Sequence, residues 1–149
     1  MNLTQNFTLE ELCYSATAEK YKINNNAPTH IACDLAILCD RCLQPIRNKI
    51  GIMDVSSGYR SPALNTKVKG SSTSQHCKGQ ACDFVPRNKA LSYKEIFKWI
   101  NSNLIFDQLI EEFDSQGNHW IHISYNPRGK NRKEILLYKN GVYSKYNLG

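Results

Sequence analysis

The stretch between residues 74 and 83 reads Ser74-Gln75-His76-Cys77-Lys78-Gly79-Gln80-Ala81-Cys82-Asp83 and leads from a polar loop into an apolar strand. Gly79 allows the backbone to turn tightly, so that His76 lies on the loop while Asp83 stands on the strand that follows. A carboxylate between Cys82 and Phe84 is costly to bury unless a cation or a hydrogen-bonding partner compensates it. The stretch therefore predicts a loop-to-strand transition with one possible metal ligand on each side of Gly79.

The second informative stretch reads His119-Trp120-Ile121-His122-Ile123-Ser124 and predicts another strand. Side chains alternate between the two faces of a strand, which places His122 on the face of Trp120 and Ser124. A lone histidine in an apolar strand is more often a packed core residue than a ligand. These two stretches, however, contain all but one of the four histidines, and catalytic zinc is commonly held by His with one carboxylate. We therefore predict a metal site made by His76, Asp83 and His122.

Outward from these stretches, apolar periodicity predicts helices early in the chain and strands late. A short helix begins near Thr8, and a long amphipathic helix runs from Pro28 to Ile46, where Pro45 is expected to kink or end it. Two more helices are predicted, a brief one that opens at Ser61-Pro62 and one over residues 92–103. Strands are predicted at residues 53–57, 81–85, 106–113, 120–125, 135–139 and 142–146, the last two joined at Asn140-Gly141. This order favours an α+β fold with a small antiparallel sheet packed against N-terminal helices.

The composition excludes several classes of protein. The chain has 149 residues, 41% hydrophobic and 21% charged, which predicts one globular domain over residues 1–149 rather than a disordered or fibrous protein. No stretch approaches the roughly 18 apolar residues of a membrane span, and the N-terminus lacks the pattern of a secretory signal. We therefore expect a chain without membrane insertion that is cytoplasmic when synthesised. In that compartment its six cysteines, including the pair Cys39 and Cys42, are expected to be free thiols.

The positive charge is concentrated at the C-terminal end. The net charge is +6, and residues 127–149 carry six Lys or Arg against one Glu. A basic segment suits an anionic partner such as nucleic acid, a membrane surface or a cell-wall polymer. Tyr138, Tyr143 and Tyr146 offer stacking faces for nucleic acid, but aromatic hairpins with outward lysines are usually solvated sheet edges. We therefore expect no nucleic-acid partner.

The pattern Ser-x-His-x-x-Gly-x-Ala-x-Asp, preceded by Ser57-Gly58-Tyr59-Arg60-Ser61-Pro62 and followed by Trp120-Ile121-His122, resembles the zinc D-Ala-D-Ala metallopeptidases. This family includes D-alanyl-D-alanine carboxypeptidases and dipeptidases, and phage endolysins that cut L-alanyl-D-glutamate bonds. The resemblance covers residues 6–126 and is strongest to small members of phage or prophage type. It implies a hedgehog/D-Ala-D-Ala-peptidase-like fold, one zinc ion per chain, and hydrolysis of an amide bond in peptidoglycan stem peptides. We expect the protein to act as a monomer.

The resemblance also implies roles for single residues. His76, Asp83 and His122 match the three zinc ligands. Arg60 matches the substrate-binding arginine, whose guanidinium pairs with a carboxylate or with the polarised carbonyl and so takes part in catalysis. Ser74 matches the serine of the pattern, whose hydroxyl binds substrate or braces the loop. Two further residues, Asp107 and Gln108, match a strand that lies beside the site.

The general base has more than one candidate in the sequence. Many relatives have an acidic residue three positions before the last zinc ligand, where this chain has His119. An imidazole can exchange protons near neutral pH, so His119 is the predicted base. Positions 119 and 122 lie on opposite faces of a regular strand, however, so this role needs a bend before Trp120. The alternatives are Glu111 and Glu112 on the preceding strand.

The histidine at this position also motivates an alternative function. A non-hydrolytic cell-wall-binding or virion structural module could keep the same fold and zinc ion. A cysteine hydrolase using Cys77 or Cys82 is less favoured, because nothing near either thiol would activate it. Without a secretory signal, action on the cell wall requires release from the cell or delivery as a virion-associated protein.

Overall fold

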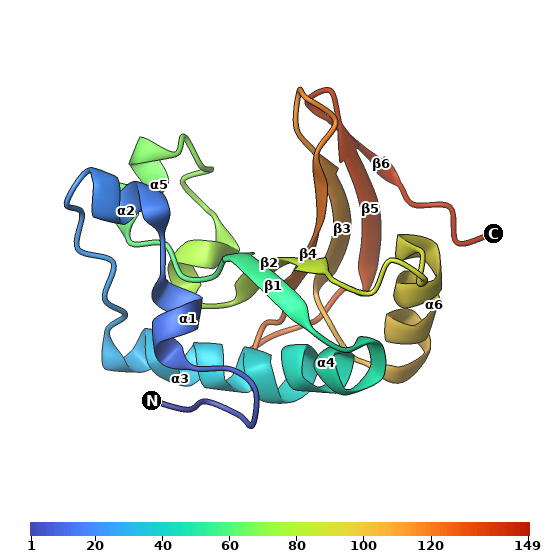
Figure 1. Cartoon of the computed structure of the whole chain (residues 1–149), viewed down its shortest axis with the longest axis horizontal. Coiled ribbons are helices and arrows are strands. Elements are labelled where there is room, and N and C mark those ends of the chain that lie inside the picture. Colours follow the sequence, from blue (N-terminus) through green and yellow to red (C-terminus); the bar gives the residue numbers. More distant parts are fainter.

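The computed structural model describes residues 1–149 and has a mixed α+β architecture, as predicted (Figure 1). The helices are α1 (Leu9–Cys13), α2 (Ala16–Lys20), α3 (Thr29–Leu38), α4 (Gln44–Ile50), α5 (Pro62–Lys67) and α6 (Tyr93–Asn103). The strands are β1 (Met53–Ser57), β2 (Ala81–Pro86), β3 (Gln108–Phe113), β4 (His119–Ser124), β5 (Glu134–Lys139) and β6 (Val142–Lys145). Two short helical turns complete the list, the π-helical η1 (Cys39–Leu43) and the 3-10 turn η2 (Gln75–Lys78).

Two helices, α1 and α6, begin where their capping residues predict. Thr8 accepts the backbone N–H of Glu11 at the start of α1, and Ser92 forms a capping box with Glu95 at the start of α6. These side chains satisfy backbone donors that have no partner inside the helix. No helix of the structure combines the length and the apolar character that a membrane span requires.

Pro45 does not end the long helix, contrary to one of the two outcomes expected for it. Helical structure continues from α3 through η1 and α4 to Ile50. The widened turn η1 lies directly before the proline, and the N–H of Gln44 donates to the carbonyl of Cys39, five residues back. Since proline lacks an N–H and crowds the preceding turn, a π-helical turn accommodates it without breaking the helix.

The six strands form one sheet in the order β1-β2-β4-β3-β5-β6. Every neighbouring pair is antiparallel except β3 and β5, which are parallel, so the predicted antiparallel sheet contains one pair of the other type. The parallel pairing arises because the connection after β4 returns along the sheet. The N–H groups of Lys133 and Glu134 donate to the carbonyls of Phe106 and Asp107, so β5 starts beside the start of β3.

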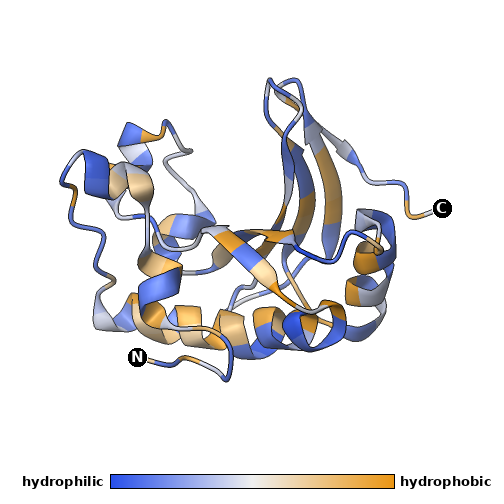
Figure 2. Cartoon of the chain, in the orientation of Figure 1, coloured by the Kyte–Doolittle hydropathy of each residue, from blue (hydrophilic) through white to orange (hydrophobic).

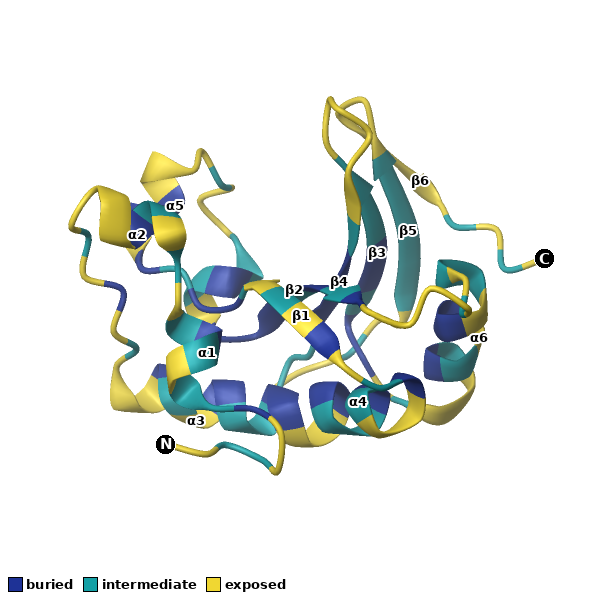
Figure 3. Ribbon diagram, in the orientation of Figure 1, coloured by how far each residue is buried: buried dark blue, intermediate teal, exposed yellow.

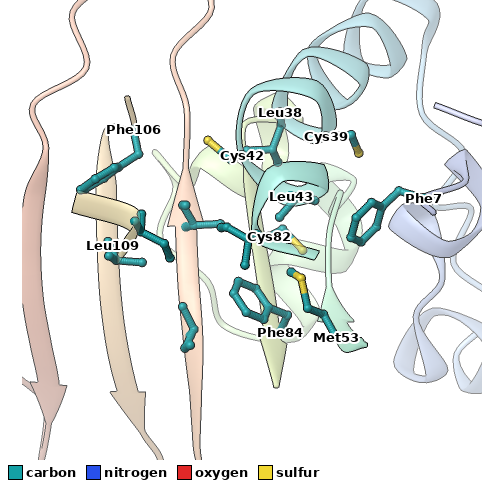
Figure 4. Packing of buried hydrophobic residues seen from close by; sticks show 14 of the residues in the cluster. Phe7, Leu38, Cys39, Cys42, Leu43, Met53, Cys82, Phe84, Phe106 and Leu109 are labelled. Carbon is teal, nitrogen blue, oxygen red and sulfur yellow. The ribbon is translucent and has the colours of Figure 1, made fainter. Parts of the chain in front are cut away.

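One face of the sheet packs against the helices and forms the core. In Figure 4, Cys82 of β2 lies beside Leu43 of the long helix, and Leu109 of β3 lies near Phe106 in the same core cluster. The buried residues of α3, α4 and α6 lie on the sides that face the interior (Figure 3), and much of the apolar surface of α3 and α4 lies there too (Figure 2). This packing leaves the opposite face of β2, β4 and β3 uncovered by the long helix.

All six cysteines are free thiols, as predicted. Cys39 and Cys42 are buried in η1, where burial raises the pKa of each thiol to about 12. A thiol with so high a pKa is protonated and unreactive at neutral pH. The pair therefore contributes to the apolar core.

Candidate metal centre

The structure brings together the three predicted metal ligands on the uncovered face of the sheet. Asp83 on β2 lies opposite His122 on β4, and η2 supplies His76. Oδ1 of Asp83 lies 2.8 Å from Nδ1 of His122 and 3.3 Å from Nε2 of His76. The three candidate ligand atoms all lie within 4.8 Å of one another. A single ion can therefore contact all three side chains.

His76 is held through both its backbone and its imidazole ring. Its backbone N–H donates to the hydroxyl of Ser74, and its Nδ1 lies 2.7 Å from the carbonyl oxygen of Gly58. Gly79 ends η2 in a left-handed conformation with φ 68°, and a Cβ there would lie 2.8 Å from the carbonyl oxygen of Ile31. Glycine is required at this position because both the conformation and the space exclude a side chain.

The donor set fits a divalent metal ion. A carbonyl oxygen only accepts hydrogen bonds, so Nδ1 of His76 carries a proton and Nε2 is the ring nitrogen turned toward Asp83. Burial alone would raise the pKa of Asp83, but the two histidines lower it well below its usual range. The side chains of His76, Asp83 and His122 are only 3%, 13% and 9% exposed. Two imidazoles and one buried carboxylate match the nitrogen and oxygen donors that zinc takes in proteins.

Glu112 is the carboxylate nearest the cluster. It lies on β3 opposite Trp120 of β4, and therefore on the same face as His122. Its Oε1 lies 3.5 Å from Nδ1 of His122, and its side chain is 19% exposed. Burial raises the pKa of Glu112, and the negative charge of Asp83 raises it further, while His122 and Arg60 oppose this shift. Glu112 is thus close to the cluster without being one of the three ligands.

His119 lies on the other face of the sheet, contrary to the role predicted for it. Strand β4 is regular from His119 to Ser124 and does not bend before Trp120. Nδ1 of His119 lies 2.8 Å from Oε2 of Glu111, and its ring stacks on Phe113 with 5.1 Å between centroids. His119 and Glu111 therefore form a separate pair behind the sheet, and Glu112 is the predicted alternative that the structure brings to the cluster.

The remaining predicted residues lie around the cluster. Arg60 donates its backbone N–H to the carbonyl of His76, and its Nε is buried without a hydrogen-bond partner. Ser74 caps η2, so its hydroxyl braces the loop. Asp107 is buried. Its carboxylate accepts a hydrogen bond of 2.9 Å from Nε2 of Gln75 and forms an ion pair with Arg132. This contact holds η2, which contains Gln75, against the start of β3. The neighbouring residue Gln108 lines a cavity beside the cluster.

Two neighbouring cavities border the cluster, and we call the two together the cluster groove. The larger cavity has a volume of about 640 Å³ and is lined almost entirely by polar side chains. The smaller cavity has a volume of about 320 Å³ and adds apolar side chains, among them Leu64 and Trp120. Arg60, Asp83 and Glu112 line both cavities. The larger cavity is lined by all three candidate ligands, and the smaller one by Asp83 alone of the three.

The family of the chain follows from comparison with known sequences. The sequence model of one family, described as Peptidase M15, matches residues 5–124 and includes the three ligands, Arg60 and Glu112. This chain belongs to the peptidase M15 family. The match confirms the predicted family of zinc D-Ala-D-Ala metallopeptidases, and M15 peptidases are zinc-dependent. Strands β5 and β6 of this M15 peptidase lie beyond the matched residues. Comparison with the curated proteins gives no significant match.

Proposed function

We propose that this M15 peptidase hydrolyses an amide bond in the stem peptides of bacterial peptidoglycan. The observation that carries the proposal is the position of His76, Asp83, His122 and Glu112 beside the two cavities of the cluster groove. Three nitrogen and oxygen ligands with a nearby carboxylate are the arrangement of a hydrolytic zinc site.

The metal ligands in this proposal are His76 through Nε2, Asp83 through its carboxylate and His122, with one zinc ion per chain. When bound, zinc supplies Lewis-acid chemistry, because it lowers the pKa of water and polarises a carbonyl group. The carbonyl of Gly58 fixes the His76 ring so that Nε2 faces Asp83. This orientation avoids reorganisation of the site when the ion binds.

Glu112 is the proposed general base. Its carboxylate takes a proton from the water that attacks the scissile carbonyl carbon, and it returns the proton to the departing amine nitrogen as the C–N bond breaks. Arg60 donates hydrogen bonds to the carbonyl oxygen as negative charge develops there, or to a carboxylate of the peptide. Arg60 lines both cavities beside the cluster, which supports this role.

The shape of the cluster groove favours cleavage within a peptide over removal of a terminal residue. All three candidate ligands line the larger cavity, and the smaller cavity, which shares Asp83 and Glu112 with it, provides further space beside the cluster. The larger cavity also has two exposed lysines in its lining, Lys78 and Lys130. Stem peptides carry free carboxylates, which such a lining attracts.

The test is chemical analysis of the reaction together with metal analysis. Purified protein is expected to contain about one zinc per chain and to release fragments from isolated peptidoglycan, whose masses identify the bond that is cut. The variant His76→Ala is expected to lose both zinc and cleavage. Full zinc content without cleavage of any cell-wall preparation would overturn the hydrolytic function and favour the non-hydrolytic wall-binding or virion module. The histidine at position 119 no longer favours that module, because Glu112 lies at the cluster.

The proposal includes where and in what form the protein acts. All residues of the cluster come from one chain, which supports action as a monomer. Peptidoglycan lies outside the cytoplasm, so the proposed substrate is reached after release from the cell or as part of a virion.

A further inference from the structure

The C-terminal hairpin of β5 and β6 contributes to the cluster groove although it lies outside the residues matched by the family. Glu112 of β3 lies opposite Tyr138 of β5, and Tyr138 lies opposite Tyr143 of β6. Residues directly opposite each other share one face of a sheet. Trp120, Glu112, Tyr138 and Tyr143 therefore form a row across four strands, on the face that holds the metal ligands. We call this set the aromatic row.

The two ends of the aromatic row lie in different cavities. Trp120 lines the smaller cavity and Tyr143 the larger one, while Glu112 lines both. Neighbouring strands are about 4.8 Å apart, so Tyr143 lies about 10 Å along the sheet from Glu112. An extended peptide covers this distance with roughly three residues. A peptide whose scissile amide lies at Glu112 thus reaches Tyr143 with its third residue on that side.

Tyr143 is presented to the cluster groove by its neighbours. Its ring packs on Tyr138 with 4.5 Å between centroids, and the residue remains 58% exposed. The turn at Asn140 and Gly141, with φ 54° and 74°, fixes the register of the hairpin. Burial raises the pKa of the Tyr143 hydroxyl, and the charges of Glu112 and Asp83 raise it further. The hydroxyl is therefore a protonated donor within electrostatic reach of the cluster.

We infer that Tyr143 is a substrate-binding residue that holds the peptide about three residues from the scissile amide. The inference rests on the proposed peptidase function. An exposed aromatic ring with a hydroxyl packs on a peptide chain and donates a hydrogen bond to it, at small entropic cost because Tyr138 already restrains the ring. The residue positions the substrate in the larger cavity and does not exchange protons in the reaction.

The experiment compares zinc-loaded wild-type protein with Tyr143→Ala on synthetic stem peptides of graded length. The variant is expected to raise KM about tenfold on the full-length peptide, with kcat, zinc content and thermal midpoint nearly unchanged. Peptides shortened to fewer than three residues on one side of the cleaved bond are expected to remove the difference between the two proteins. Shortening the other side is expected to preserve it. The matched control is Val142→Ala, whose side chain is exposed and points to the opposite face of β6.

The outcomes separate this inference from the proposed function. Equal KM values for wild type and Tyr143→Ala, in a protein that cleaves, would overturn the inference alone. An increase in KM for Tyr143→Ala that persists on every shortened peptide and accompanies a lower thermal midpoint would also overturn it. The tyrosine pair would then act only in the stability of the hairpin. Wild-type protein that contains zinc but neither binds nor cleaves the peptides would overturn both.

Discussion

The carboxylate of Glu112 lies 3.5 Å from Nδ1 of His122, on a neighbouring strand and on the same face of the sheet. The proposed base and the proposed metal ligand are therefore brought together by strand pairing and not by closeness along the chain. His119, which is closer to His122 in sequence, points away from the groove.

This relationship predicts that substitutions of the two adjacent glutamates have different effects on kcat. The variant Glu112→Gln removes the proton acceptor, so kcat is expected to fall by about 10²–10⁴-fold while zinc content is retained. The matched control is Glu111→Gln, which changes the neighbouring residue on the other face and is expected to keep kcat within a few-fold of wild type. Steady-state kinetics and metal analysis of both variants give the measurement. Equal losses in the two variants would contradict the assignment of Glu112.

Metal binding is expected to stabilise the fold. An ion that binds the folded protein alone raises the free energy of unfolding by about 2.7 kcal/mol at a free concentration one hundred times its Kd. Chelation of the purified protein is therefore expected to lower the thermal midpoint, and added zinc to restore it. The variant His122→Ala is expected to show no such response. A zinc-dependent midpoint that survives this substitution would place the ion elsewhere.

Gly79 is expected to tolerate no side chain. In Gly79→Ala the new Cβ lies 2.8 Å from the carbonyl oxygen of Ile31. The alanine backbone must also keep a positive φ. The control Gly117→Ala has the same strain, with φ 84°, but nothing within 4 Å of the new Cβ. We expect the first variant to lose about 2–4 kcal/mol in the free energy of unfolding and the second about 1 kcal/mol. Urea denaturation measures both, and equal losses would show that the contact with Ile31 relaxes at no cost.

The ion pair between Asp107 and Arg132 predicts a pH dependence of stability. The hydrogen bonds from Arg132 hold the pKa of the Asp107 carboxyl below its usual range. A depressed folded-state pKa stabilises the protein above the unfolded value of about 3.9, and this stabilisation is lost as the pH falls through the folded value. The free energy lost in Arg132→Gln is therefore expected to be constant between about pH 5 and 8 and to shrink below about pH 4.

The size of this effect is modest because half of the Arg132 side chain is solvent-exposed, whereas Asp107 is 5% exposed. We expect a loss of about 1–2 kcal/mol near neutral pH, which is below the value for a fully buried pair. The matched control is Arg87→Gln, which breaks an ion pair with the exposed Asp54 and is expected to have a much smaller effect. A loss in Arg132→Gln that stays constant down to pH 2 would contradict the linkage to Asp107.

Sequence reasoning found the parts of the site that depend on local pattern. Asp83 in an apolar strand and His122 on an alternating strand are visible as anomalies, because each places a polar side chain where burial is costly. The choice between His119 and Glu112 depended instead on which residues of β3 and β4 lie opposite each other. Alternation showed that positions 119 and 122 face opposite sides, but only the register places Glu112 on the side of His122.

The C-terminal segment shows the same limit for charge. Its count of basic residues suggested a free cationic surface, yet Arg128 and Arg132 pair with the buried carboxylates of Asp34 and Asp107. These partners are remote in sequence, so a charge count cannot reveal them. The parallel placement of β5 was missed for a related reason, because these ion pairs fix the connection that returns the chain to the start of β3.

The attachment of β5 to β3 has a consequence for the solubility of the protein. In the order β1-β2-β4-β3-β5-β6, removal of the hairpin would leave β3 as the outermost strand, with its backbone donors and acceptors unpaired. An edge of that kind recruits strands from other molecules and promotes aggregation. In the intact chain the outermost strand on this side is β6, which is four residues long, exposed throughout and ends in Lys145. The hairpin thus covers an aggregation-prone edge strand and leaves a short edge strand that ends in a lysine.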